Sequence, residues 1–294
     1  MLGVINRLNG AFANVYADRL RTARGTMTAI ATISALMPHI TGSPYVSPAA
    51  AQDLIQYLDL TTDELTKSNM TRAEIEAGLA NLKDGETLDL STKWLNKLDL
   101  SGMDLTRTNL RASRLNGSNL KGAKLDGVQL DAAWALKADF TGASFIGASL
   151  FQTQMMDCKI DGANFSNAMV GADFSRATLT NAIFDHAMLG PDLTNQSMGL
   201  MRGVLKGANL EGASFKGANL TRSAFEYASL KGANFEGANL DGAELGGADL
   251  TGANIAGANL EKADVNSAKL LGLKGKDSAK GLDKMLNLDR AFKD

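Results

Sequence analysis

Cysteine, histidine and proline are scarce in this chain of 294 residues, which contains one Cys, two His and four Pro. A single cysteine excludes an intramolecular disulfide framework and does not indicate a compartment. Three His and Cys residues in all provide no clustered ligands for zinc. No stretch reaches about 18 consecutive apolar residues, so no membrane-spanning helix is expected. The net charge of −2 argues against a general attraction to nucleic acids.

A large apolar residue instead recurs at every fifth position over most of the chain. Residues 230–250 read LKGANFEGANLDGAELGGADL, with Ala two places before each large residue and often Gly two places after it. A period of five fits neither an amphipathic helix, with a period of about 3.6, nor a flat strand, with a period of about 2. Residues i and i−2 of a short extended segment point to the same side. Each unit therefore directs one large and one small apolar group inward, and the chain must wind into a β-solenoid.

A second period predicts the size of a coil. The tetrapeptide GANL occurs at 217–220, 237–240 and 257–260, which is every 20 residues or four units. The pattern predicts a square coil in which Asn219, Asn239 and Asn259 stack in one column. Steps of five from Leu90 to Leu270 correspond to about nine coils, stacked at a strand spacing of about 4.8 Å.

Tandem A(N/D)LxG units over roughly residues 88–270 resemble the pentapeptide-repeat family. The resemblance implies a right-handed quadrilateral β-helix. We therefore expect an α-helical region at 1–86, the β-helix at 87–272 and a short C-terminal helical cap at 273–294. The family includes proteins that protect DNA gyrase by imitating duplex DNA, bacterial secreted effectors and members of unassigned role. This chain departs from the DNA mimics, because residues 87–272 carry 19 acidic and 17 basic residues.

Charge is unevenly distributed along the predicted solenoid. Residues 93–124 hold seven Lys and Arg, whereas residues 232–266 hold six Asp and Glu. Clustered like charge costs stability unless a partner uses it, although such runs also serve simply as solvated faces. Four acidic residues are expected at one corner over two successive coils, as a candidate interaction site: Asp241, Glu244, Glu261 and Asp264.

The register of the repeat slips between Val170 and Leu205. Leu193 and Met198 are assigned as large residues of irregular units, and because the slips cancel, the coil register is predicted to be the same on both sides. Pro191 stands where Ala is expected. The segment forms either a bulge at one corner or a projecting loop for a partner. The candidate loop residues are Pro191, Asp192, Asn195 and Gln196.

Both ends of the chain lack the repeat. Apolar residues follow helical spacing over residues 4–20, and Thr71–Glu74 is a capping box that predicts another helix. The first helix suits a membrane surface or a partner groove, or it packs on its helical neighbours or covers the first coil. Its candidate docking residues are Arg7, Phe12, Tyr16, Arg19 and Arg21. At the other end, a helical cap or, by resemblance, a contact between two copies is expected from Leu282, Met285, Leu286, Leu288 and Phe292.

No catalytic constellation is recognisable. Cys158 is predicted to point inward and His186 outward, so they cannot form a Cys–His pair, and every Gly-x-Gly match is a by-product of the repeat. We expect a protein without enzymatic activity, cofactor or direct nucleic-acid binding. It is interpreted as an interaction or structural solenoid whose helical N-terminus docks to a larger assembly or a membrane surface. A DNA mimic that binds gyrase or topoisomerase and a secreted effector are the alternatives. The compartment is left open, with the cytoplasm favoured over secretion or a particle.

Overall fold

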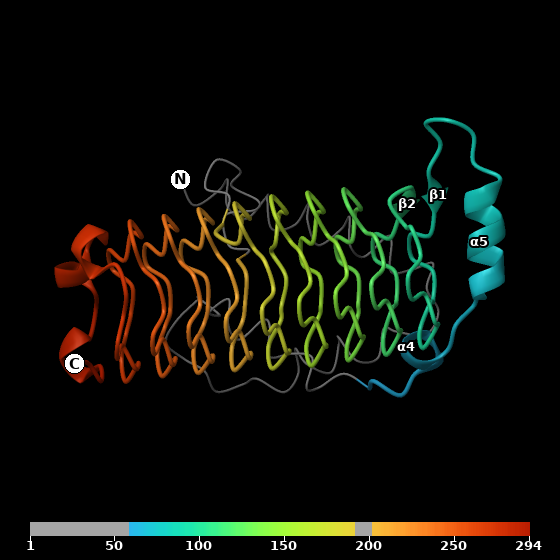
Figure 1. Ribbon diagram of the computed structural model, residues 1–294. Helices are drawn as coiled ribbons and strands as arrows, with labels where there is room; N and C mark the ends of the chain where they lie inside the picture. The colour runs from blue at the N-terminus through green and yellow to red at the C-terminus, as the bar shows by residue number, and fades with distance from the viewer. Residues whose placement is uncertain (1–58, 192–201) are drawn as a thin grey trace, which may run out of the picture. The chain divides into compact units, whose positions relative to one another are not determined.

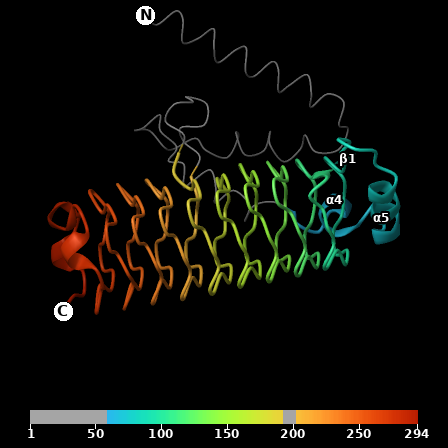
Figure 2. The ribbon, with the colours of Figure 1, turned by 45° about the horizontal axis from the view of Figure 1, so that its top comes forward.

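The computed structural model describes residues 59–191 and 202–294. Residues 60–294 form one compact unit and residues 1–59 form another. The predicted docking residues Arg7, Phe12, Tyr16, Arg19 and Arg21 therefore lie outside the described residues, as do Asp192, Asn195 and Gln196. The unit at 60–294 is a rod of stacked coils (Figures 1 and 2). Within the described ranges, no helix is long and apolar enough to cross a membrane.

Successive coils pair in parallel along the rod. The two short strands β1 (Leu88–Asp89) and β2 (Thr108–Asn109) pair with Leu88 opposite Thr108. Isolated parallel bridges continue this pairing on every side, for example from Asp99 to Asn119 and from Asn119 to Asp139. Bridged residues are 20 positions apart in regular coils, which confirms the predicted coil of four units. The predicted column of Asn219, Asn239 and Asn259 is also confirmed, because these residues bridge in turn.

The core is a single stack of the inward residues. The large residue of each unit and the small residue two places before it are buried at the described positions from Met103 to Leu270, as predicted, whereas at the first small positions Lys93 is exposed and Leu98 is partly buried. One side of the rod carries a column of phenylalanines whose rings stack face to face. The ring centroids of Phe165 and Phe184 are 4.7 Å apart, and those of Phe184 and Phe215 are 5.1 Å apart. The looser early coils keep the same arrangement, with Met103, Thr108 and Ser113 buried at the small positions.

The second residue of most described corners is left-handed, which explains the glycine of the repeat. At Gly217 φ is +64°, and an added Cβ would lie 2.7 Å from the imidazole of His186 in the preceding coil. A left-handed residue carries no penalty when it is glycine. Glycine at this position therefore both closes the corner and leaves room for the longer side chain of the coil before it.

A short helical segment covers the first coil. Helix α4 (Asp63–Thr66) is followed by α5 (Arg72–Ala80), whose predicted capping box is present because Thr71 and Glu74 each accept a hydrogen bond from the other's backbone. Ile75 of α5 is fully buried, and Leu79 packs against the same core. Figure 1 shows α5 at the end of the rod where β1 begins. An exposed apolar cross-section is the weakness of a solenoid end, and α5 removes it here.

The C-terminal segment forms a further coil instead of the single helix that was expected. Three 3₁₀ turns, η2 (Lys276–Ser278), η3 (Leu282–Lys284) and η4 (Leu288–Arg290), alternate with residues that bridge to the preceding coil. The five predicted contact residues therefore separate into two groups. Leu282, Met285 and Leu288 pack against the core, whereas Leu286 and Phe292 bridge to Asp264 and Lys269 and are exposed. Bridging residues recur every six positions here, which one continuous α-helix cannot satisfy.

The prediction of an unchanged coil register across residues 170–205 is wrong. Gln154 bridges to Asp173, which is one residue short of a regular coil, and Asp173 bridges to Val204, which is 31 residues further on. Leu205 thus follows Leu189 by a single step around the coil. Leu193 and Met198, which the sequence pattern assigned as inward residues, lie outside the described residues, and the repeat after 205 is displaced by two sides relative to the repeat before 170.

Candidate interaction surfaces

The four acidic residues singled out from the sequence do lie together. Asp241 and Glu261 occupy one corner of two successive coils, and Glu244 and Asp264 bridge on the adjoining side. Two of them are ion-paired within the molecule. Arg202 binds the carboxylate of Glu244 through two contacts of 2.6 and 2.8 Å, and Lys284 lies 3.3 Å from Glu261.

The remaining two acidic residues have no ion pair within the described ranges. Asp264 accepts a hydrogen bond of 2.8 Å from the side-chain amide of Asn287. One carboxylate oxygen of Asp241 is buried without a hydrogen-bond partner. The protein itself therefore neutralises two of the four acidic residues, which lowers the cost of the clustered charge.

Glu244 is the most strongly held of these acids. Burial by itself would raise the pKa of Glu244, but hydrogen bonds and the charge of Arg202 outweigh it and hold the pKa below its usual range. Arg202 also donates to the carbonyl oxygen of Arg222. Arg202 lies two residues before Val204, which bridges to Asp173, so this contact helps to hold the start of the coil that follows. The sequence contains no signal for this pair, because its members are 42 residues apart.

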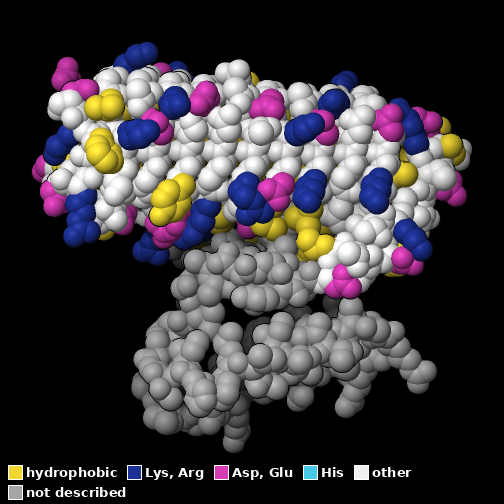
Figure 3. Space-filling model, turned by 90° about the horizontal axis from the view of Figure 1, so that it is seen from below, with side chains coloured by type: hydrophobic (Ala, Val, Ile, Leu, Met, Phe, Trp, Pro, Cys, Tyr) yellow, Lys and Arg dark blue, Asp and Glu magenta, His cyan; other side chains and the backbone are white. Residues whose placement is uncertain are grey.

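Ion pairs between neighbouring coils neutralise much of the remaining surface. Lys206 pairs with Glu226 at 2.8 Å, and Lys216 pairs with Glu236 at 3.0 Å, in each case one coil apart. Lys269 pairs with Asp249 at 3.1 Å in the same way. On the face drawn in Figure 3, Lys and Arg side chains are interspersed with Asp and Glu along the rod. This surface lacks the continuous negative charge that imitates a nucleic acid.

The basic stretch at 93–124 is only partly neutralised. Arg114 binds Glu64 of α4 at 2.6 Å and lies over the ring of Trp134, with 5.5 Å between the guanidinium carbon and the ring centroid. Lys121 pairs with Asp139 at 3.3 Å. Lys93, Lys97 and Lys124 form no ion pair within the described part of the chain. Residual positive charge therefore lies near the capped end of the rod.

The predicted separation of the reactive side chains is confirmed. Cys158 is buried in the core, where its thiol lies 2.8 Å from the carbonyl oxygen of Ala135, and His186 is exposed at a corner. Burial raises the pKa of the Cys158 thiol far above its usual range, so the thiol stays protonated and is a poor nucleophile. Among the described residues, no group of three or more His, Cys, Asp and Glu side chains is placed to hold a metal ion.

The repeat, the four-sided coil and the parallel pairing agree with one protein family. The model of the pentapeptide repeats matches in eight copies within residues 95–131, 123–162, 158–190, 204–237 and 228–266, which is more than half of the chain. The chain belongs to the pentapeptide-repeat family, whose members fold as right-handed quadrilateral β-helices. No curated protein sequence matches the chain.

Solved structures of the same family resemble this chain. HetL, a pentapeptide repeat protein involved in heterocyst differentiation regulation from the cyanobacterium Nostoc sp. strain PCC 7120, is 28% identical over 76% of this chain and 95% of its own, with a TM-score of 0.45. QnrB1, a plasmid-mediated fluoroquinolone resistance protein, is 18% identical over 71% of this chain and 92% of its own, with a TM-score of 0.39. A pentapeptide repeat protein of the Arabidopsis thaliana thylakoid lumen is 25% identical over 43% of this chain and 67% of its own, with a TM-score of 0.19.

Proposed function

We propose that this protein is a non-catalytic interaction scaffold, in which the solenoid is a rigid support and the N-terminal residues dock to a protein assembly or to an anionic membrane surface. The observation that carries the proposal is the position of α5. Ile75 and Leu79 of this helix already cover the first coil, so the capping role does not fall to the basic segment at residues 4–20. That segment has an apolar stripe and, together with the residue just after it, three arginines that a cap would not need, namely Arg7, Arg19 and Arg21.

The solenoid is suited to a supporting role because its core and backbone pairing are continuous. Each coil contacts only its neighbours, so a docked segment at one end does not have to rearrange the core. The buried, protonated thiol of Cys158 and the exposed His186 provide no paired nucleophile and base. Membership of the pentapeptide-repeat family is consistent with a protein-binding role.

Imitation of duplex DNA fits this surface poorly. A DNA mimic must present negative groups that a DNA-binding partner can pair with. Here Glu226, Glu236 and Asp249 are each paired with a lysine of an adjacent coil. These exposed pairs contribute little to stability, but they reduce the negative field that a gyrase-type partner would recognise.

The docking role is tested with the full chain, a chain lacking residues 1–24 and a variant with Arg7→Gln, Arg19→Gln and Arg21→Gln. The binding partner is supplied as vesicles of stated anionic lipid content for co-sedimentation, and as cell extract for pull-down. We expect the truncated chain to keep its circular dichroism spectrum and lose recruitment. The triple variant should lose most of the recruitment, and the native chain should be released by salt. A solenoid that melts when residues 1–24 are absent would show that they act as a cap and would overturn the proposal.

A further inference from the structure

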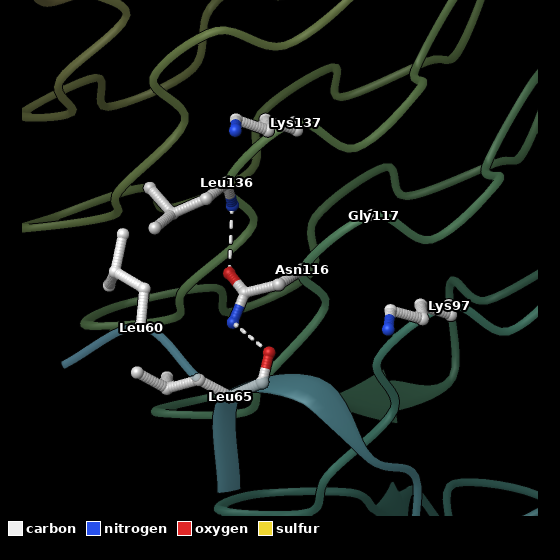
Figure 4. Close-up of a pocket in the computed structure, with 7 residues that line it drawn as sticks. All are labelled: Leu60, Leu65, Lys97, Asn116, Gly117, Leu136 and Lys137. Carbon is white, nitrogen blue, oxygen red and sulfur yellow. Dashed lines mark hydrogen bonds between the residues drawn. The ribbon is translucent and has the colours of Figure 1, made fainter. Parts of the chain in front are cut away.

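A pocket of about 200 Å³ lies at one corner of the rod, between the helical segment that contains α4 and the first three coils. Figure 4 shows three leucines in it: Leu60 and Leu65 from the helical segment, and Leu136 from the solenoid. Lys97, Gly117 and Lys137 occupy equivalent positions of three successive coils along the same corner. The pocket therefore combines an apolar floor with two cationic side chains at its rim.

The apolar floor is held in place by a ladder of asparagines. Asn96 donates to the carbonyl oxygens of Glu64 and Lys67 at 2.9 and 2.6 Å and accepts from the backbone of Asn116 at 3.0 Å. Asn116 in turn donates to the carbonyl of Leu65 at 3.3 Å and accepts from the backbone of Leu136 at 2.9 Å. Figure 4 shows these last two bonds. The pocket is therefore preformed, and binding would not have to order it.

The two rim lysines are available to a ligand. Both are exposed, and neither Lys97 nor Lys137 has an ion-pair partner in the ranges that the structure describes. The carboxylate that follows Lys137 at this corner, Asp157, is bound by Arg176 through two contacts of 2.8 Å. The stem of Lys97 leans over Gly117, where an added Cβ would be 3.6 Å from Cγ of the lysine. Glycine at this position keeps the space between the two lysines open.

The size of the pocket indicates what kind of ligand it fits. Pockets for small molecules and cofactors usually enclose about 300–1,000 Å³. A volume of about 200 Å³ instead suits one large apolar side chain, which is the form of anchor that protein partners commonly insert. We propose that this pocket receives a single Leu or aromatic side chain from an acidic segment of a protein partner, with carboxylates on either side bound by Lys97 and Lys137. This inference rests on the proposed scaffold function and names one of its binding sites.

The spacing of the lysines sets the spacing of the acids. Lys97 and Lys137 are two coils apart, or about 9.6 Å along the rod at a strand separation of about 4.8 Å. An extended peptide advances about 3.3 Å per residue, so acidic residues three positions apart span the same distance. The segment recognised therefore has two acidic residues three positions apart with the large apolar residue between them, in extended conformation along the corner.

The probe for this site is a fluorescein-labelled peptide of sequence Ser-Glu-Leu-Ser-Glu-Ser, and its binding to the full chain is followed by fluorescence anisotropy. We expect saturable binding that weakens as salt is added. Lys97→Gln with Lys137→Gln should weaken it about ten-fold, because two exposed ion pairs are lost. The matched control is Lys124→Gln with Lys262→Gln, which removes the same charge from two exposed lysines away from the corner of the pocket and should leave the affinity unchanged.

The apolar floor is tested by Leu136→Asn. The corresponding corner residues of the two preceding coils are Asn96 and Asn116, so this change extends an existing ladder and should keep the fold, which circular dichroism verifies. We expect binding about five-fold weaker or worse, from loss of apolar contact. A peptide with Ser in place of Leu should bind no better to the native chain than to Leu136→Asn.

Three results would overturn the proposed binding site. They are no saturable binding of the leucine peptide to the native chain, equal affinity of the native chain for the serine and leucine peptides, or pocket variants that bind the leucine peptide as tightly as the native chain does. Failure of the pocket and failure of the scaffold give different results. If residues 1–24 are needed for recruitment but the probe does not bind, only the proposed role of the pocket is wrong. If the probe binds at the pocket but deletion of residues 1–24 leaves recruitment intact, the docking role of the N-terminus is wrong.

Discussion

Phe184→Leu should destabilise the solenoid far more than Phe140→Leu, although both make the same chemical change in the core. Leu is the usual large residue of this repeat, so each variant places in the core a side chain that the repeat already uses at inward positions. Phe184 is fully buried between Phe165 and Phe215, at 4.7 and 5.1 Å between ring centroids, and meets Phe174 edge-on at 6.1 Å. Phe140 is equally buried but contacts one ring, that of Phe145, at 5.3 Å.

The expected difference follows from the number of ring contacts. An aromatic pair contributes roughly 0.5–1.5 kcal/mol beyond the area it buries. Phe184→Leu loses three such pairs and should lower the free energy of unfolding by roughly 1.5–4.5 kcal/mol from ring contacts alone. Phe140→Leu loses one pair, or roughly 0.5–1.5 kcal/mol. The smaller volume of leucine adds a similar cavity term to both variants, so it cancels in the comparison.

Urea unfolding followed by circular dichroism measures both variants against the native chain. Hydrogen exchange at the backbone amides near residue 184 shows whether the loss is local, since a solenoid can open in sections. Equal losses in the two variants would refute the additive contribution of the stacked rings. A larger loss for Phe140→Leu would mean that the place of a residue within the core matters more than ring contact.

Two further predictions concern buried charge. Leu240→Asp should lower the free energy of unfolding by several kcal/mol, because Leu240 is fully buried and the carboxylate would have no partner. Asn239→Asp should lower it by only about 1 kcal/mol, because Asn239 faces outward and loses the bond that its amide donates to Thr221. Equal decreases in the melting temperatures of the two variants would show that the inward assignment of Leu240 is mistaken. Asp173→Asn should raise the melting temperature at neutral pH, because burial raises the pKa of Asp173 and its ionised form destabilises the folded state. Protonation of the native carboxyl gains stability as the pH falls through that raised pKa, so the advantage of the variant should shrink in acid, and an advantage that grows in acid would contradict this assignment.

The substitution Asp173→Asn is a fair test because the repeat already has asparagine at equivalent positions. Asp173 accepts bonds from the backbone and hydroxyl of Ser175 at 2.8 and 2.5 Å. Asn164 accepts the same two bonds from Ser166 at 2.9 and 2.6 Å. The substitution therefore keeps the corner geometry and removes only the charge.

The repeat could be interpreted from sequence because every unit places the same kinds of residue at the same positions. A large residue such as Leu120 and a small one such as Ala123 recur with a period that only a winding chain satisfies, so the inward residues, the four-sided coil and the asparagine columns were all predictable. The capping box at Thr71 was equally local. These features depend on contacts between residues that are near in sequence or exactly one coil apart.

What the sequence did not predict depends on contacts at irregular separations. The shift of two sides after Leu189 could not be predicted from the sequence. The large residues recur every five positions, so a net shift by a multiple of five residues leaves their spacing unchanged. The form of the C-terminal coil was missed because Leu282, Met285 and Leu286 have the i, i+3, i+4 spacing of a helical stripe. The pocket joins Leu60 and Leu136, and no periodicity links a helical segment to a particular corner.

The position of α5 also determines the order in which the rod is completed during synthesis. The ribosome delivers the chain from its amino terminus, so the helix that carries Ile75 is made before the first coil that it covers. Each later coil can then pair with a finished neighbour as it emerges, and only the growing edge is unpaired at any moment. Unpaired strand edges are where nascent chains join one another. Among the described residues, the coil with η2, η3 and η4 is the last to pair with its neighbour.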